Sequence, residues 1–80
     1  MTLDEAKTLI FKRLCFEYKL RGEEARVQWK ALPQELGIAE DVFGEAVKGL
    51  RDAHIIEMML PAHMRLASLG RERCKQGTEI

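Results

Sequence analysis

The chain has no long apolar run, since none of its 80 residues belongs to a stretch approaching the ~20 apolar residues needed to cross a bilayer. The N-terminus also lacks the apolar segment of a secretory signal and has Asp4 and Glu5 there instead. Cysteine is scarce, with only Cys15 and Cys74. Disulfide-dependent domains from oxidising compartments usually have more. We therefore predict a cytoplasmic protein without a membrane partner. Its two cysteines are expected to be separate buried thiols, although a bridge between them is chemically allowed.

Net charge is also absent, because 13 basic residues balance 13 acidic ones. A dedicated nucleic-acid binder is usually basic, since lysine and arginine release counterions from the phosphate backbone. The distribution of charge matters more than the sum, and residues 40–52 are the most acidic segment, with a net charge of −2.

The sequence contains no glycine-rich phosphate loop, no nucleophile elbow and no cluster of His, Asp and Ser. Its potential metal ligands, Cys15, His54, His63 and Cys74, do not have the short spacings of metal sites. We therefore expect no enzymatic activity, no metal, no cofactor and no small-molecule substrate.

Helical patterns dominate the first two thirds of the chain. Thr2 and Glu5 have the spacing of a capping box, and a helix is predicted from there to about Leu20, ending at Gly22. Its apolar stripe is expected to consist of Leu3, Ala6, Leu9, Ile10, Leu14 and Tyr18, widened by Phe11 and Phe16. The polar connector Glu23–Gln28 is expected to contain at most a short strand.

A short helix is predicted from Lys30 or Leu32 to Leu36, with Pro33 in its first turn. Gly37 is expected to provide the positive φ of a tight turn. A third helix then begins near Ala39–Glu40. Its apolar face has 3.6-residue spacing and comprises Val42, Phe43, Ala46, Val47 and Leu50.

The segment His54–Leu60 is rich in β-branched and long apolar residues, and Pro61-Ala62 separates it from His63–Ser68. This pattern predicts a β-hairpin. Strand alternation would place Ile56, Met58 and Leu60 on one face and Ile55, Glu57 and Met59 on the other. A short C-terminal helix is expected from Ser68 or Leu69, and Gly77–Ile80 is expected to fray.

The order of these elements resembles the winged helix-turn-helix domain of bacterial and archaeal transcription regulators. The resemblance covers about residues 3–75 and rests on the Leu36-Gly37-Ile38 turn, the Ile55-Ile56 pair and the closing sequence Leu66-Ala67-Ser68-Leu69-Gly70-Arg71-Glu72. Alanine replaces the family's threonine at position 67. The resemblance implies a single α+β domain over residues 1–80, with the helix-turn-helix at about 30–52, the wing at about 54–67 and the last helix at about 68–76.

In this family, the third helix enters the major groove of duplex DNA and the wing contacts the backbone, commonly in a dimer or larger assembly. The resemblance thus predicts a DNA-binding protein in transcription regulation. The nucleic-acid-binding candidates are Lys30, Glu40, Gly44, Glu45, Lys48, Arg51, His63 and Arg65. The chain departs from the family in its acidic third helix, with Asp41 beside Glu40 and Glu45, and in its short apolar wing tip.

The acidic third helix leaves a second interpretation open, a protein-interaction or dimerisation module without nucleic-acid binding. Candidates for an exposed apolar patch are Tyr18, Trp29, Met59, Leu60 and Pro61. For Trp29 we instead expect a position capping the core between the first two helices.

Overall fold

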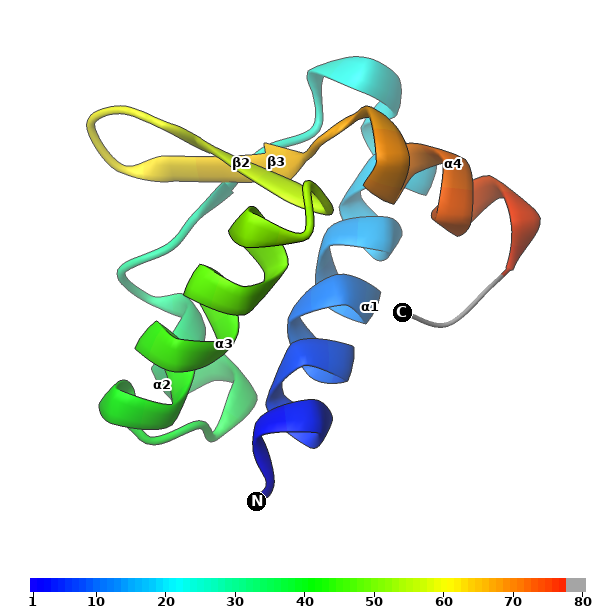
Figure 1. The fold of residues 1–80 in the computed structure, drawn as a ribbon. Helices are drawn as coiled ribbons and strands as arrows, with labels where there is room; N and C mark the ends of the chain where they lie inside the picture. The colour runs from blue at the N-terminus through cyan, green and yellow to red at the C-terminus, as the bar shows by residue number, and fades with distance from the viewer. Residues whose placement is uncertain (78–80) are drawn as a thin grey trace.

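The computed structural model describes residues 1–77 of the chain, and its first element is helix α1 (Leu3–Arg21; Figure 1). The predicted capping box is present: the Glu5 amide donates to Thr2 Oγ1 (3.1 Å), and the Thr2 amide donates to Glu5 Oε1 (3.0 Å). The bond from the Thr2 amide, followed by the interaction with the Thr2 hydroxyl, lowers the pKa of Glu5 because both stabilise its carboxylate. The helix buries Ala6, Ile10, Phe11 and Leu14 and stops at Gly22, whose φ is 76°.

The prediction that Phe16 widens the buried stripe is wrong, because its side chain is 58% exposed. At 3.6 residues per turn, Phe16 lies about 200° around the helix from buried Leu14. Glu17 is buried instead. Its Oε1 accepts a hydrogen bond from Arg13 Nη1 (2.8 Å), and its Oε2 lies 3.2 Å from Arg21 Nε without hydrogen-bond geometry. The two arginines compensate the charge of this carboxylate.

The connector after α1 contains the 3-10 helix η1 (Gly22–Glu24), which was not predicted, and the short strand β1 (Val27–Gln28). Helix α2 (Leu32–Leu36) follows with Pro33 in its first turn, and Gly37 ends it with a φ of 69°. Helix α3 (Glu40–Asp52) starts where predicted and packs against α1 through Phe43, Ala46 and Leu50 (Figure 1).

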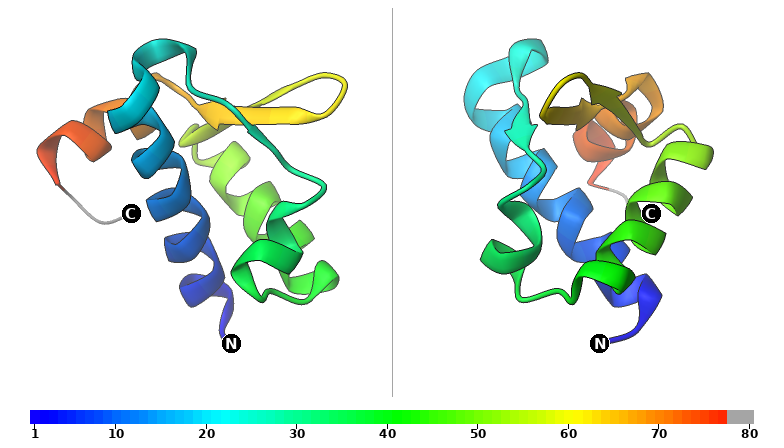
Figure 2. Two further views of the ribbon diagram at one scale, coloured as in Figure 1. Left: turned by 180° about the vertical axis from the view of Figure 1, so that it is seen from behind. Right: turned by 90° about the vertical axis from the view of Figure 1, so that its left-hand side faces the viewer.

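Strands β2 (Ile56–Met59) and β3 (His63–Leu66) form the hairpin, and β1 adds to β3, so that the antiparallel sheet has the order β1-β3-β2. Met58 pairs with Met64, and Glu57 pairs with Arg65. The inner face of the sheet contributes Ile56, Met58, Met64 and Leu66 to the core or its edge. The helices lie on this side, and the hairpin end projects past α3 (Figures 1 and 2).

Two of the predicted strand positions are wrong. Leu60 does not share the inner face; it lies in the turn, next to the cis Leu60–Pro61 peptide bond, and is 90% exposed. Ile55 does not lie on the outer face either. It precedes β2 and is only 2% exposed. Strand alternation applies only within a strand, and the strand is shorter at both ends than its composition suggested.

Ile55 is the junction between α3, the hairpin and helix α4 (Ser68–Gln76). Its amide donates to Leu50 O (2.9 Å), and its carbonyl accepts from the Ala67 amide (2.9 Å). Helix α4 approaches so closely that a Cβ on Gly70 would lie 2.1 Å from Ile55 O. The position of α4 therefore depends on a glycine at residue 70.

The expectation of two separate thiols is also wrong. Helix α4 crosses α1 and brings Cys15 and Cys74 together as a disulfide, with their Cα atoms 5.8 Å apart. Their separation of 59 residues gave no sign of this proximity, because it arises only when α4 folds back over α1.

The described elements give the α+β class that the sequence predicts, with four α-helices and a three-stranded antiparallel sheet within residues 1–77. Over the same residues, no helix is both long and apolar enough for a membrane span. Of the end that was expected to fray, Gly77–Ile80, the first residue is ordered: Gly77 caps α4 with a φ of 68°, and its amide donates to Cys74 O (3.2 Å). Residues 78–80 lie outside the described part.

Candidate interaction face formed by α3 and the hairpin

Helix α3 turns one side to the core and leaves the other uncovered. Phe43, Ala46 and Leu50 are buried. The uncovered side, called the α3 face below, consists of Glu40, Asp41, Gly44, Glu45, Lys48, Arg51 and Asp52, all exposed. Most of the residues predicted to read DNA therefore do lie together on one accessible surface.

The α3 face has four carboxylates and two cations, and within residues 1–77 none of them takes part in an ion pair. Glu40 and Asp41 lie in the first turn, where carboxylates interact favourably with the helix dipole. Arg51 lies in the last turn. The first half of the face, from Glu40 to Glu45, is consequently negative, and both cations follow it along the helix.

An apolar groove borders the α3 face. Its volume is about 540 Å³, and it separates the start of α3 from the β1–α2 connection and β2. It is lined by Trp29, Lys30, Pro33, Glu40, Phe43, Gly44, Val47 and Met58. Gly44 leaves the groove open, because a Cβ at this position would have no atom within 4 Å. The Lys30 ammonium lies 5.9 Å from the centre of the Trp29 ring. A cationic side chain and a carboxylate thus flank a mainly apolar surface.

The basic residues of the hairpin do not face the groove. Strand alternation places His63 and Arg65 on the outer face of the sheet, because Met64 and Leu66 are buried. Arg65 Nε donates to Glu57 Oε1 across the strand pair. Arg65 also lines a separate hollow of about 650 Å³ with Arg21, Glu24, Arg26 and Met59. The basic residue of the hairpin therefore faces away from the groove and is already paired.

Comparison with known proteins gives no significant match to a family model, a curated protein or a solved structure.

The structure divides the eight predicted nucleic-acid-binding candidates into three sets. Lys30, Glu40 and Gly44 meet in the groove. Glu45, Lys48 and Arg51 lie on the α3 face beyond it. His63 and Arg65 belong to the outer face of the sheet. A continuous basic surface through Lys30, Lys48, Arg51 and Arg65 is therefore not formed.

Trp29 has a second position besides the expected one. It is half-buried and packs against the core, as expected, and in addition it lines the groove opposite α3. Met58 packs against the core and also contributes to the same groove. The Arg21–Arg26–Arg65 hollow was not predicted, because these arginines come from α1, the connection before β1, and β3, which share no periodicity.

The potential metal ligands Cys15, His54, His63 and Cys74 do not assemble, since residues 1–77 bring no group of three or more such side chains together. Cys15 and Cys74 are joined to each other.

Proposed function

We propose that the chain is a winged-helix domain of the transcription-regulator type whose α3 face and adjoining groove bind a protein partner. The order of its elements supports the fold assignment: three helices, a strand before the second, and a hairpin that pairs with that strand in the order β1-β3-β2. The apolar groove beside an acidic, unpaired α3 face is the observation that supports the function.

The charge of the α3 face opposes the close approach of a phosphate backbone. Glu40, Asp41 and Glu45 lie within two turns of the helix, a span comparable to the Debye length of about 8 Å at physiological salt. They therefore act on an approaching phosphate together. Arg65 of the hairpin cannot offset these three carboxylates, because it is turned to the other face of the sheet and is paired with Glu57.

The same features define the chemistry of a protein partner. Trp29, Phe43, Val47 and Met58 provide an apolar and aromatic surface, the composition typical of the centre of an interface. The carboxylates beside it favour lysine or arginine on the partner. We infer a partner segment with one or two large apolar side chains flanked by basic residues. The competing occupant of the groove is a second copy of this chain, which would make the protein a homodimer. A measurement of the oligomeric state in solution distinguishes the homodimer from a complex with another protein.

Duplex DNA is the second candidate, and one observation favours it. Helix α2, the Gly37 turn and α3 form a helix-turn-helix arrangement in which the outer side of α3 is uncovered and the hairpin projects beside it (Figure 2). A carboxylate such as Glu45 could accept a hydrogen bond from cytosine N4 in the major groove. The expected role in transcription regulation and the cytoplasmic location remain part of the proposal under both candidates.

The charge reversal Glu45→Lys distinguishes the two candidates, because they predict opposite changes in binding affinity. Glu45→Lys adds a cation to the α3 face, so it should weaken binding of a basic amphipathic peptide about five- to tenfold and strengthen binding to random duplex DNA. Glu23→Lys makes the same change on η1, away from this face, and should leave peptide binding unaltered. Both titrations are measured by fluorescence anisotropy at low salt.

The outcomes are distinct. The protein-partner proposal is abandoned if the peptide does not bind the wild type, or if Glu23→Lys weakens the peptide as much as Glu45→Lys does. Binding of wild-type protein to random duplex DNA below about 10 µM, lost in Lys48→Gln and Arg51→Gln, would establish the DNA candidate instead.

A further inference from the structure

The Arg21–Arg26–Arg65 hollow lies on the outer face of the sheet, away from the core. Its volume is about 650 Å³, within the ~300–1,000 Å³ typical of ligand pockets. It is lined by Arg21, Glu24, Arg26, Met59 and Arg65. The end of α1 and η1 lie on the side of the sheet away from α3 (Figures 1 and 2), so they form a wall beside the floor that the sheet provides.

Two of these arginines are neighbours across adjacent strands. The register that pairs Val27 with Met64 brings Arg26, the residue before β1, beside Arg65 of β3. Because Val27 and Met64 are buried, strand alternation turns both arginines to the outer face. Side chains at opposite positions of antiparallel strands have Cβ atoms about 4.5–5.5 Å apart. The two guanidiniums can therefore contact the same anionic group.

The charge of this arginine pair is only partly balanced. Like charges at opposite positions of a sheet are destabilising. Glu57 lies across from Arg65 on its other side, and its Oε1 accepts a hydrogen bond from Arg65 Nε. Arg26 forms neither an ion pair nor a side-chain hydrogen bond with another residue of the range 1–77. The row Arg26–Arg65–Glu57 therefore has one cation in excess, on the side of Arg26.

The contacts with carboxylates orient two of the guanidiniums without occupying their ends. Arg65 is held through its Nε by Glu57, and Arg21 Nε lies 3.2 Å from Glu17 Oε2. Over the described residues, the terminal Nη groups of Arg21 and Arg65 form no hydrogen bond. A guanidinium can donate two parallel hydrogen bonds to a phosphate or a carboxylate. The hollow thus has free N–H donors from three arginines.

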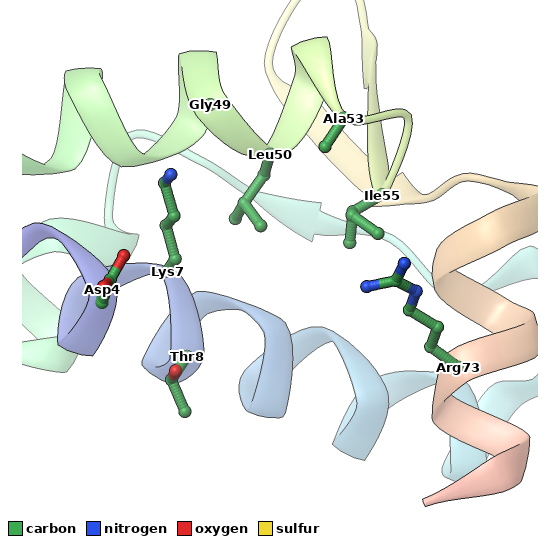
Figure 3. A pocket seen from close by; sticks show the side chains of 8 residues that line it. All are labelled: Asp4, Lys7, Thr8, Gly49, Leu50, Ala53, Ile55 and Arg73. Carbon is green, nitrogen blue, oxygen red and sulfur yellow. The ribbon is translucent and has the colours of Figure 1, made fainter. Parts of the chain in front are cut away.

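The smaller hollow between α1, the end of α3 and α4 has a different arrangement of charge. Its volume is about 320 Å³, and its lining includes Lys7 and Arg73. Figure 3 shows the two charged groups at opposite ends of this hollow, with Lys7 near Gly49. A single anionic group would not meet both cations there, whereas the strand register places Arg26 and Arg65 side by side.

We propose that the Arg21–Arg26–Arg65 hollow binds a small organic phosphate monoester. Its phosphate lies between Arg26 and Arg65, Arg21 is the third donor, and its organic group contacts Met59. A phosphate monoester has three strong acceptor oxygens, one for each guanidinium, whereas a carboxylate has two. This site is separate from the groove and the α3 face, so it does not depend on the function proposed above.

The carboxylates around the hollow set the expected affinity. Glu17 and Glu57 already balance part of the charge of Arg21 and Arg65, and Glu24 in the lining repels an anion. We therefore expect a dissociation constant in the millimolar range, about 4 kcal/mol of binding free energy, rather than tight binding.

Phenyl phosphate tests the proposal in the wild-type protein by amide chemical-shift titration near pH 7.5, about 1.5 units above its second pKa of about 6. It should bind saturably and shift the amides of Val27 and Arg65. Phenyl sulfate, which has the same shape but a single charge, should bind at least about threefold more weakly. Inorganic phosphate, which lacks the organic group, should also bind about threefold more weakly.

Two pairs of variants assign the charges. Arg26→Gln should weaken phenyl phosphate about tenfold. Its matched control is Arg51→Gln, which removes an exposed, unpaired arginine from α3 and should leave the affinity unchanged. Glu24→Gln should strengthen binding about threefold, because it removes a repelling carboxylate from the lining, and Glu23→Gln on the same 3-10 helix should have a smaller effect. Amide spectra verify that each variant is folded.

Several results overturn the proposal. They are the absence of saturable binding of phenyl phosphate to wild type, equal or tighter binding of phenyl sulfate or inorganic phosphate, and equal weakening by Arg26→Gln and Arg51→Gln. Weaker binding in Glu24→Gln also contradicts it. Random duplex DNA is titrated in parallel, and a larger loss of DNA binding than of phenyl phosphate binding in Arg26→Gln would assign these arginines to a nucleic-acid backbone instead. The comparison of the three small anions needs no variant.

Discussion

Replacing Gly70 with alanine should destabilise the fold strongly, although alanine is the better helix former. The added Cβ would lie 2.1 Å from Ile55 O, whereas ordinary contacts of a Cβ begin near 3.4 Å. Helix α4 and the Ile55 backbone must therefore separate by more than 1 Å. That displacement disrupts the 2.9 Å hydrogen bond from the Ala67 amide to Ile55 O.

Three contributions set the magnitude. Overpacking against a rigid backbone costs about 1–3 kcal/mol. A buried carbonyl left without its donor costs a further 1–3 kcal/mol or so. The higher helix propensity of alanine offsets about 1 kcal/mol of this loss of stability. We expect a net loss of about 3 kcal/mol in the free energy of unfolding, a large share of the roughly 4–12 kcal/mol expected for 80 residues.

Gly44→Ala is the matched control, since it makes the same change inside a helix where a Cβ would have no atom within 4 Å. It should stabilise the protein by about 0.5–1 kcal/mol. Urea unfolding followed by far-UV circular dichroism measures both variants. A Gly70→Ala midpoint at or above that of wild type would contradict the expected clash with Ile55 O.

Two further perturbations act on the disulfide and on the capping box of α1. Reduction of the Cys15–Cys74 disulfide, which spans 59 residues, should lower the free energy of unfolding by up to about 4 kcal/mol. Reductant should have no effect on the doubly substituted Cys15→Ser/Cys74→Ser protein, and equal stability of oxidised and reduced wild type would contradict this expectation. Because the capping box lowers the pKa of Glu5, its stabilisation is complete above the ordinary value of 4.5 and is lost as pH falls through the lower folded-state pKa. Glu5→Gln should flatten the acid side of the stability–pH curve, and an unchanged slope would show that the box does not contribute.

The helices were predictable because local patterns determine them. The capping residues of α1, Pro33 in the first turn of α2, Gly37 after it, and the apolar face of α3 each act over one or two turns. Phe16 shows the limit of such patterns, because an apolar residue beside a stripe can be assigned to it although it lies on the opposite side of the helix.

The features that depend on chain segments far apart in sequence were not predictable. The groove forms only when Trp29, which lies in the β1–α2 connection, comes close to α3 and to Met58 of β2. The disulfide requires α4 to cross α1, and the hollow lined by Lys7, Leu50 and Arg73 requires both of these helices together with the end of α3. The residue types were visible in the sequence, but their proximity follows from packing.

The hydrogen bonds of Ile55 also have a consequence for the motions of the hairpin. The base of the hairpin is held through Leu50 O and the Ala67 amide, while its tip at Leu60 is exposed. Amides near the tip can exchange with solvent through small local openings. The amides of Ile55 and Ala67 can exchange only when the end of α3, the hairpin base and the start of α4 separate. The hairpin should therefore move as an arm about a fixed base, and exchange of its hydrogen-bonded amides should slow from the tip at Leu60 toward Ile55.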